Sequence, residues 1–491
     1  MNRRSLPLLL VLALTVAAGA SAQEPAPAPP PPDEHAGHRH DPPPAETPAP
    51  APAPAHPRDA TGHLQHPAAG ASAGEQDLTA GAALRLADLE RRALDRHPAL
   101  ERARAAIAAA EGRREQAGRW PNPEVGLVGE ELGLEDDGEA GKYGGLLSQR
   151  FVLGGKLARA RAVRDAQLEQ ARTRAEAARL ATLTRVRTAY YHALAAQQGV
   201  AVTERLATLA AEAVDVTDQL FNTGAADLPD RLAAQIEARR SSLELTGARR
   251  ELEAAWRALE GAVGPDRLEP GPLEDVFAGP LPALDRDATR RVILEQSPAL
   301  ALARLEVERA DAVLARERRI KVPDLEVEVG LLDNQEPVAP GGPRLGSEAF
   351  AEARISLPLF DRNRGQIAAA EAEQRAARAG VEQARLDLEA RFAEAFAGYA
   401  SAAEAAAAYR NEILPAARES YDLYLASYQQ MTAAYPQVLV AQRTLFQAEA
   451  DALAALVELW DAAARLEGRL VTEGDGPGAA GTLGGSGGDD E

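Results

Sequence analysis

The sequence predicts a mainly α-helical protein with a small membrane β part, built from two copies of one unit. One observation is a repeated segment. HPALERARAAIAAAEGRREQAGRWPNPEVGLV starts at His97, and SPALALARLEVERADAVLARERRIKVPDLEVEV starts at Ser297. The second observation is that each half reads as a helix, a short strand pair, a very long helix, a turn and a shorter helix. Such a period is far too long for a solenoid of small repeats and indicates a duplicated domain. These pairs share an offset of 200: Pro98 and Pro298, Leu100 and Leu300, Arg104 and Arg304, Pro123 and Pro323.

Composition narrows the class of protein. Aromatic residues make up only 4% of the chain and alanine is abundant, which suits long helices in close contact. The formal net charge of −20 makes nucleic acid an unsuitable partner. The chain has no cysteine, which excludes disulfides, thiolate metal sites and a lipid anchor on a cysteine.

Residues 1–22 have the composition of a signal peptide. Arg3 and Arg4 precede the apolar stretch LPLLLVLALTVAAGA, and Ala20-Ser21-Ala22 is a small-residue cleavage site. No other stretch approaches the roughly 18–20 apolar residues of a membrane helix. We therefore expect a mature protein that is periplasmic, secreted or in the outer membrane.

Residues 23–77 are rich in proline and histidine, so we expect an extended, unfolded arm. Imidazole nitrogens bind transition metals, and weak metal binding by His35, His38 and His40 is one hypothesis. A solvated linker with incidental histidines is the alternative. The Gly-rich residues 471–491 are predicted to be a disordered tail.

Two repeats follow the arm, joined by a Pro- and Gly-rich linker at 265–285. Helical periodicity predicts long helices, and at 1.5 Å per residue some 65 residues make a rod of roughly 100 Å. Val186, Tyr190 and Leu194 share one stripe of the first rod, which predicts core packing. The first repeat, 78–264, is predicted to contain strands at about 123–153, a long helix at about 156–222 and a return helix at 230–263. The second, 286–470, is predicted to contain strands at about 324–359, a long helix at about 363–430 and a return helix at 437–470.

The strands alternate apolar and charged residues, which gives each strand pair one apolar face and one face directed to water. Such strands fit a membrane barrel with lipid outside and water inside, and the alternative is a soluble hairpin on a core. Four strands cannot close, and an open edge in lipid leaves backbone groups unpaired. Three copies would supply twelve strands, so we predict a homotrimer. The predicted lumen residues are Glu326, Glu328, Glu348, Glu352 and Arg354.

From about Leu84 to Leu470 the chain resembles the TolC family of outer-membrane efflux ducts. The resemblance rests on PNPEV and VPDLEV before the strands, LPLFDRNRGQIAAAEAE after them, the turn FNTGAADLPDRLAAQ, and YPQVLVAQRTLFQAEADALAALVELWDAAARL. The sequence of these segments is most similar to outer-membrane components of cobalt–zinc–cadmium type efflux systems. The resemblance implies a homotrimeric channel in outer-membrane lipid, with a twelve-strand barrel and a helical tunnel across the periplasm. It also implies a periplasmic adaptor (membrane fusion protein) and an inner-membrane pump driven by protons.

The resemblance further implies roles for the helix-turn tips. An aromatic–x–x–Gly turn at each tip meets the adaptor in this family, and Phe221 with Gly224 matches it. Tyr428 matches in the second half, where Met431 replaces the glycine. Aspartates after the tips narrow the tunnel mouth in the family; Asp230 fits this pattern and Gln437 does not.

The leading hypothesis is therefore a passive exit duct, with no catalysis and no cofactor, that carries heavy-metal cations. Drugs or other small organic molecules are the alternative cargo. A periplasmic coiled-coil adaptor is a second class of function, and metal buffering by the His-rich arm is a third. His97 and His192 stand alone in the folded part, and we expect structural roles for both.

Overall fold

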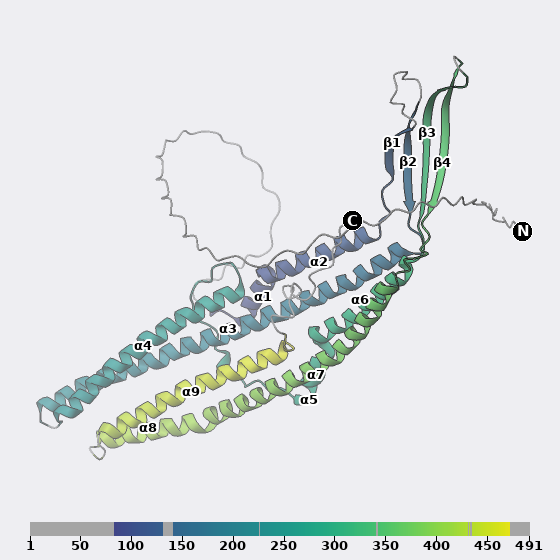
Figure 1. Ribbon diagram of the computed structural model, residues 1–491. Helices are drawn as coiled ribbons and strands as arrows, with labels where there is room; N and C mark the ends of the chain where they lie inside the picture. The colour runs from purple at the N-terminus through teal and green to yellow at the C-terminus, as the bar shows by residue number, and fades with distance from the viewer. Residues whose placement is uncertain are drawn as a thin grey trace, which may run out of the picture. The chain divides into compact units, whose positions relative to one another are not determined.

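The structure is a computed structural model, and long paired helices make up most of it (Figure 1). It describes residues 83–130, 141–224, 226–339, 342–430, 432 and 435–471, which all belong to one compact unit. The described chain is mainly helical with four antiparallel strands, which confirms the predicted fold class at this level. The predicted signal peptide, arm and tail, with His35, His38 and His40, lie outside the described residues. Within the described residues, no helix combines the length and apolar character needed to cross a membrane.

The first repeat contains four helices: α1 Leu86–Arg96, α2 Pro98–Ala117, α3 Lys156–Asn222 and α4 Leu228–Val263. His97 separates the first two, and its Nδ1 accepts a hydrogen bond from the Ala99 N–H at 3.2 Å, which caps α2. Helix α4 packs along α3 (Figure 1). It begins two residues before the expected start, because Asp227 is its N-cap.

The second repeat follows the same order with α5 Arg286–Gln296, α6 Pro298–Ile320, α7 Arg364–Ala408, α8 Leu414–Gln429 and α9 Tyr435–Glu467. The long helix expected at about 363–430 is interrupted by a π turn at Tyr409–Ile413. Pro415 lies two residues after this turn. It lacks an N–H, and its ring would clash with the carbonyl of residue 411 in a regular α-helix. A π turn is a known way for a helix to absorb such a misfit.

The described residues form two large apolar clusters, one centred on each repeat, and α9 contributes to both. Tyr190, Leu194 and Leu259 centre the first cluster, with Val186 buried beside them, as the stripe predicted. Leu388 and Leu459 centre the second cluster. A helix contributing such fully buried side chains is held by tertiary packing rather than by propensity alone.

The linker between the repeats is tied to both cores by tyrosine hydroxyls. The Tyr190 hydroxyl donates to a backbone carbonyl at either Leu84 (3.1 Å) or Glu274 (2.8 Å). The Tyr399 hydroxyl donates to the Pro282 carbonyl at 2.7 Å and accepts from the Leu284 N–H at 2.8 Å. The linker is therefore a packed part of the fold.

The strands form one antiparallel sheet in the order β1-β2-β3-β4. Their bounds are β1 Glu124–Glu130, β2 Lys142–Phe151, β3 Leu325–Pro337 and β4 Arg344–Ile355. The central pair, β2 and β3, joins the two repeats. β1 and β4 are the outer strands of the sheet as described (Figure 1).

Candidate functional site: helix tips, strand face and interhelical groove

The first tip is a tight turn between α3 and α4. Gly224 has φ +74°, a left-handed conformation that favours glycine, and its N–H donates to the Phe221 carbonyl at 3.0 Å. A Cβ at Gly224 would meet nothing within 4 Å, so the backbone angle, and not crowding, requires glycine here. Gly224 is exposed, so the backbone of the turn is accessible at this position.

Side chains from both helices brace this tip. The guanidinium of Arg231 lies 5.2 Å from the ring centre of Phe221 and forms an ion pair with Asp218 at 2.7 Å. A cation over an aromatic face is attracted to the ring. The Asp230 N–H donates to the Asp227 carboxylate at 3.0 Å, so Asp230 lies in the first turn of α4, half-buried. Phe221 thus faces Arg231 on the neighbouring helix.

The second tip uses different chemistry. The backbone N–H and the hydroxyl of Thr432 each make a 2.9 Å hydrogen bond to the Ser427 carbonyl, which closes the end of α8. Tyr428 is half-buried, and Gln437 is exposed in the first turn of α9. Met431 lies outside the described residues. The described residues of the two tips therefore close their helices through different hydrogen bonds.

The predicted lumen residues lie on one face of the sheet. Glu326 pairs with Arg354 in register and Glu328 with Glu352, while Glu348 is opposite Leu332. The Arg354 guanidinium is 2.7 Å from Glu352 and 3.8 Å from Glu326. The other face is apolar and exposed: Val125, Leu127, Leu147, Val329, Leu331 and Ile355. The sheet therefore has one charged and one apolar face.

One carboxylate, Asp324, anchors the junction of strands and helices. Its side chain is 11% exposed. It accepts hydrogen bonds from Arg150 (2.9 Å), from the Leu153 N–H (3.0 Å) and from the Lys156 ammonium (2.8 Å). The donors end β2 and begin α3, whereas Asp324 immediately precedes β3. One side chain thus joins the two repeats where the strands meet the helices.

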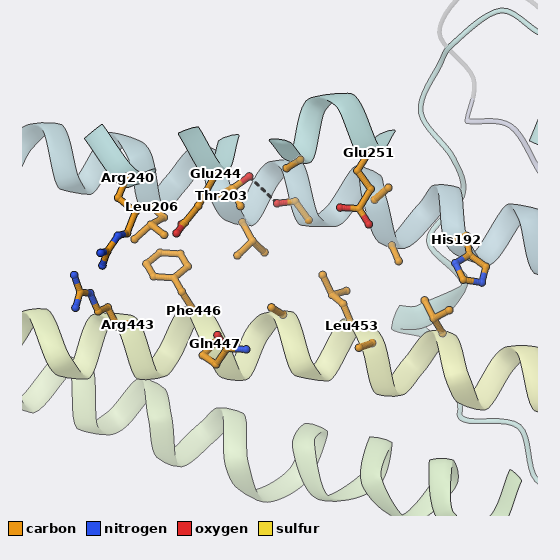
Figure 2. A pocket seen from close by; sticks show the side chains of 18 of the residues that line it. His192, Thr203, Leu206, Arg240, Glu244, Glu251, Arg443, Phe446, Gln447 and Leu453 are labelled. Carbon is orange, nitrogen blue, oxygen red and sulfur yellow. Dashed lines mark hydrogen bonds between the residues drawn. The ribbon is translucent and has the colours of Figure 1, made fainter. Parts of the chain in front are cut away.

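A groove of about 770 Å³ lies along α3 between α4 and α9 (Figure 2). Small residues, Ala195, Ala196 and Gly199, line its α3 side, and the Phe446 ring projects into it from α9. Its walls carry the carboxylates Glu244, Glu251 and Glu458. In the part of the chain that the structure describes, no three His, Asp or Glu side chains are gathered to hold a metal ion.

Ion pairs connect α3 and α4 of the first repeat to α9 of the second. Glu237 of α4 is 5% exposed and pairs with Arg443 of α9, whose Nε lies 3.1 Å from its carboxylate. Glu449 of α9 accepts from Arg205 of α3 at 3.1 Å and from Arg418 of α8 at 3.2 Å. The helical hairpins of the two repeats are thus linked by buried or half-buried carboxylates.

His192 makes another such link. Its Nε2 is 3.0 Å from the Asp461 carboxylate on α9. The hydrogen bond with Asp461 raises the pKa of His192 above its ordinary value of 6.5, against the opposing effect of burial. Folding therefore stabilises the protonated form of His192 relative to the unfolded chain.

We expect His192→Asn to remove part of the pH dependence of stability. The stabilisation from a raised pKa is complete below the unfolded value of about 6.5 and is lost as pH rises through the higher folded value. Midpoints of thermal unfolding, measured from pH 5.5 to 8.5, should therefore fall less steeply with pH in the variant than in the wild type.

His97→Asn is the matched control, because asparagine is also a good helix cap. Burial, Arg185 and Arg102 lower the pKa of His97, so its removal should change the slope in the opposite sense. Equal slopes for the wild type and His192→Asn would show that the Asp461 contact does not raise the pKa of His192 in the folded protein.

The sequence patterns located the tips and the charged strand face but missed several residues. Asp324, Glu237 and Asp461 depend on partners more than 160 residues away. Only Asp324 had a local signal, since it directly precedes an alternating strand. Leu146 and Phe350 also share the charged face, a consequence of period-2 alternation that the pattern of charges concealed.

Comparison with known proteins gives matches across both repeats. The family model described as "Outer membrane efflux protein" matches residues 89–265 and 290–470. Cobalt-zinc-cadmium resistance protein CzcC of Cupriavidus metallidurans is 27% identical over 282 residues, 57% of this chain and 65% of that protein. Nickel-cobalt-cadmium resistance protein NccC of Alcaligenes xylosoxydans xylosoxydans is 28% identical over 285 residues, 56% of this chain and 61% of that protein. The matched part thus spans less than two thirds of either relative.

Solved structures agree on the fold. The crystal structure of CusC superposes with a TM-score of 0.66 at 18% identity, covering 78% of this chain and 91% of that one. At this identity the likeness concerns the fold alone. The family model, in contrast, covers well over half of the sequence and matches the two repeats separately. The chain belongs to the outer membrane efflux protein family.

Proposed function

We propose that the protein is the outer-membrane duct of a tripartite efflux system and that its cargo is heavy-metal cations. The observation that carries the proposal is a sheet with one apolar and one charged face, continuous with two long helical hairpins. An apolar outer face suits lipid, and a charged inner face suits a water-filled passage. The metal resistance named for both curated relatives supports the choice of cargo.

Three copies complete the duct. Four strands leave β1 and β4 as outer edges, and unpaired backbone groups are costly in lipid. Trimerisation gives twelve strands, and the helical hairpins then form a tunnel through the periplasm. Exposed apolar side chains on α4, such as Leu232, Ile236 and Leu243, supply helix surface for contacts between copies.

The tips are the docking points for a periplasmic adaptor, which connects the duct to a proton-driven pump in the inner membrane. Phe221 and Gly224 form one contact, Tyr428 and Met431 the other. Asp230 and Gln437 stand at the tunnel mouth, and Glu326, Glu328, Glu348, Glu352 and Arg354 line the lumen of the barrel. The duct is passive, and the pump supplies both energy and selection.

Cellular accumulation of zinc, cobalt, cadmium and copper, beside a dye and a drug, tests the cargo. The comparison is between a strain lacking the protein and the complemented strain. We expect metals to rise in the deletion strain and the drug to stay unchanged. A rise in the dye or drug alone would transfer the proposal to small organic molecules, and no change at all would refute export.

Deleting residues 23–77 is expected to leave assembly intact and change transport little, since a Pro-rich arm buries too little apolar surface to stabilise a fold. Size-exclusion chromatography with light scattering checks the trimer, and metal accumulation checks transport. Loss of membrane insertion in the deletion variant would refute the linker hypothesis. Metal tolerance that falls by an order of magnitude would instead favour metal binding by the arm.

A further inference from the structure

The two β-hairpins are copies in the same register. Every β1–β2 pair becomes a β3–β4 pair when 204 is added to both residue numbers: Val125 and Leu147, for example, become Val329 and Ala351. The sequence supports the same offset, because EVGLV at 124–128 matches EVGLL at 328–332. The offset of 200 still holds at Pro123 and Pro323, so it grows by four residues between these prolines and the paired strands.

The joint between these copies is the β2–β3 pairing. It places Leu147 opposite Val329 on the apolar face and Leu146 opposite Gly330 on the charged face. If a sheet is built from identical hairpins, each hairpin pairs with the next in the same register. The register between β2 and β3 therefore specifies how β4 would pair with β1 of a second copy.

We propose that β4 pairs antiparallel with β1 of a second copy in the register of the β2–β3 joint. Applying the offset of 204 to that joint places Ala351 opposite Val125 of the partner subunit and Phe350 opposite the partner's Gly126. This inference rests on the trimeric assembly proposed above, and it specifies the seam residue by residue.

Side-chain sizes favour this register. On the charged face, a large residue stands beside a glycine within each hairpin: a Cβ at Gly330 would lie 2.2 Å from the Phe350 ring, and one at Gly126 would lie 3.2 Å from Leu146. The β2–β3 joint repeats this by placing Leu146 opposite Gly330. The seam repeats this alternation by placing Phe350 beside the partner's Gly126. A slip of two residues would put Phe350 opposite the partner's Glu124 or Val128.

The apolar face gives the same result. The seam pairs Ala351 with Val125 of the partner subunit and Ala349 with the partner's Leu127, a small residue against a larger one each time. A slip of one residue would exchange the faces and place charged side chains on the apolar side. On the charged face this register places Glu352 opposite the partner's Glu124, and Arg354 lies diagonal to that glutamate. The Arg354 guanidinium, which already pairs with Glu352 and Glu326, is therefore the group that offsets the like charges at the seam.

Cysteine cross-linking tests the register cleanly, because the chain has no cysteine of its own. Residues directly opposite in a sheet have Cα atoms about 4.5–5.5 Å apart, within the span of a disulfide. Diagonal neighbours lie about 7–8 Å apart, beyond that span. We expect the Val125→Cys, Ala351→Cys double variant, oxidised in outer-membrane vesicles, to shift from one-chain to three-chain mobility on non-reducing gels.

The matched controls use other alanines of the same strand face. Val125→Cys combined with Ala349→Cys or with Ala353→Cys should remain at one-chain mobility. Leu147→Cys with Val329→Cys, the equivalent pair inside one copy, shows that the oxidation works, through loss of its free thiols. Stronger cross-linking at Ala349 or Ala353 would overturn the register.

Measuring the number of subunits by light scattering distinguishes a failure of the register from a failure of the proposed trimer. A trimer that cross-links at none of the three alanines would refute the seam and leave the duct intact. A monomer in detergent and in vesicles would refute both. A three-chain band for Val125→Cys with Ala351→Cys alone supports both the seam and the trimer.

Discussion

Replacing Gly224 with valine is expected to impair export while the proposed trimer still assembles. Gly224 has φ +74°, and a left-handed conformation costs an ordinary L-residue about 1–2 kcal/mol, with β-branched residues worst placed. The valine would therefore move the turn between α3 and α4 away from its present form. An adaptor that docks on this turn would lose its contact, although the distant strand and core packing would remain.

Two measurements check this expectation on the same variant: metal accumulation in cells, and trimer mass by light scattering. Gly224→Asn is the matched control, since asparagine adopts the left-handed conformation more readily than other side chains. It should export nearly as the wild type does. Wild-type export by Gly224→Val would show that the tip is not the docking point, and a loss of trimer would show that the turn acts in folding instead.

Local patterns in the sequence account for much of the architecture. Periodicity predicts a helix at about 156–222, and α3 runs Lys156–Asn222. Alternation assigned Glu326, Glu328 and Arg354 to one face because side chains in a strand change sides at every residue. The turn at Gly224 was visible because glycine tolerates positive φ.

Features that depend on distant partners were not predictable in the same way. The Glu237–Arg443 pair joins residues 206 positions apart, and nothing near either residue identifies the other. The π turn at Tyr409–Ile413 is intermediate: Pro415 predicts a disturbance, but its form depends on how α7 and α8 pack against α9. Sequence periodicity thus predicts elements and faces, whereas the ties between repeats require the three-dimensional structure.

The most important of these ties is expected to be Asp324, and Asp324→Asn should destabilise the protein by about 2 kcal/mol. The amide keeps an oxygen for the Leu153 N–H but loses the charge that pairs with Lys156 and Arg150. Breaking a largely buried ion pair costs several kcal/mol, but Arg150 is 63% exposed, so solvent screens its share. Most of the lost stability comes from the ion pair with Lys156, whose side chain is only 20% exposed.

The midpoint of urea unfolding in detergent, followed by circular dichroism, measures this change, and heat resistance of the trimer on gels gives a second readout. Asp311→Asn is the control: its ion pair with Arg378 is 3.7 Å long and about half exposed, so the same substitution should cost under about 0.5 kcal/mol. Because Asp324 connects the end of β2 and the start of α3 to β3, the loss of stability should appear in the proposed trimer as well as in the single chain. Equal midpoints for both variants would mean that strand pairing alone holds the two repeats together and that the Asp324 ion pairs add no measurable stability.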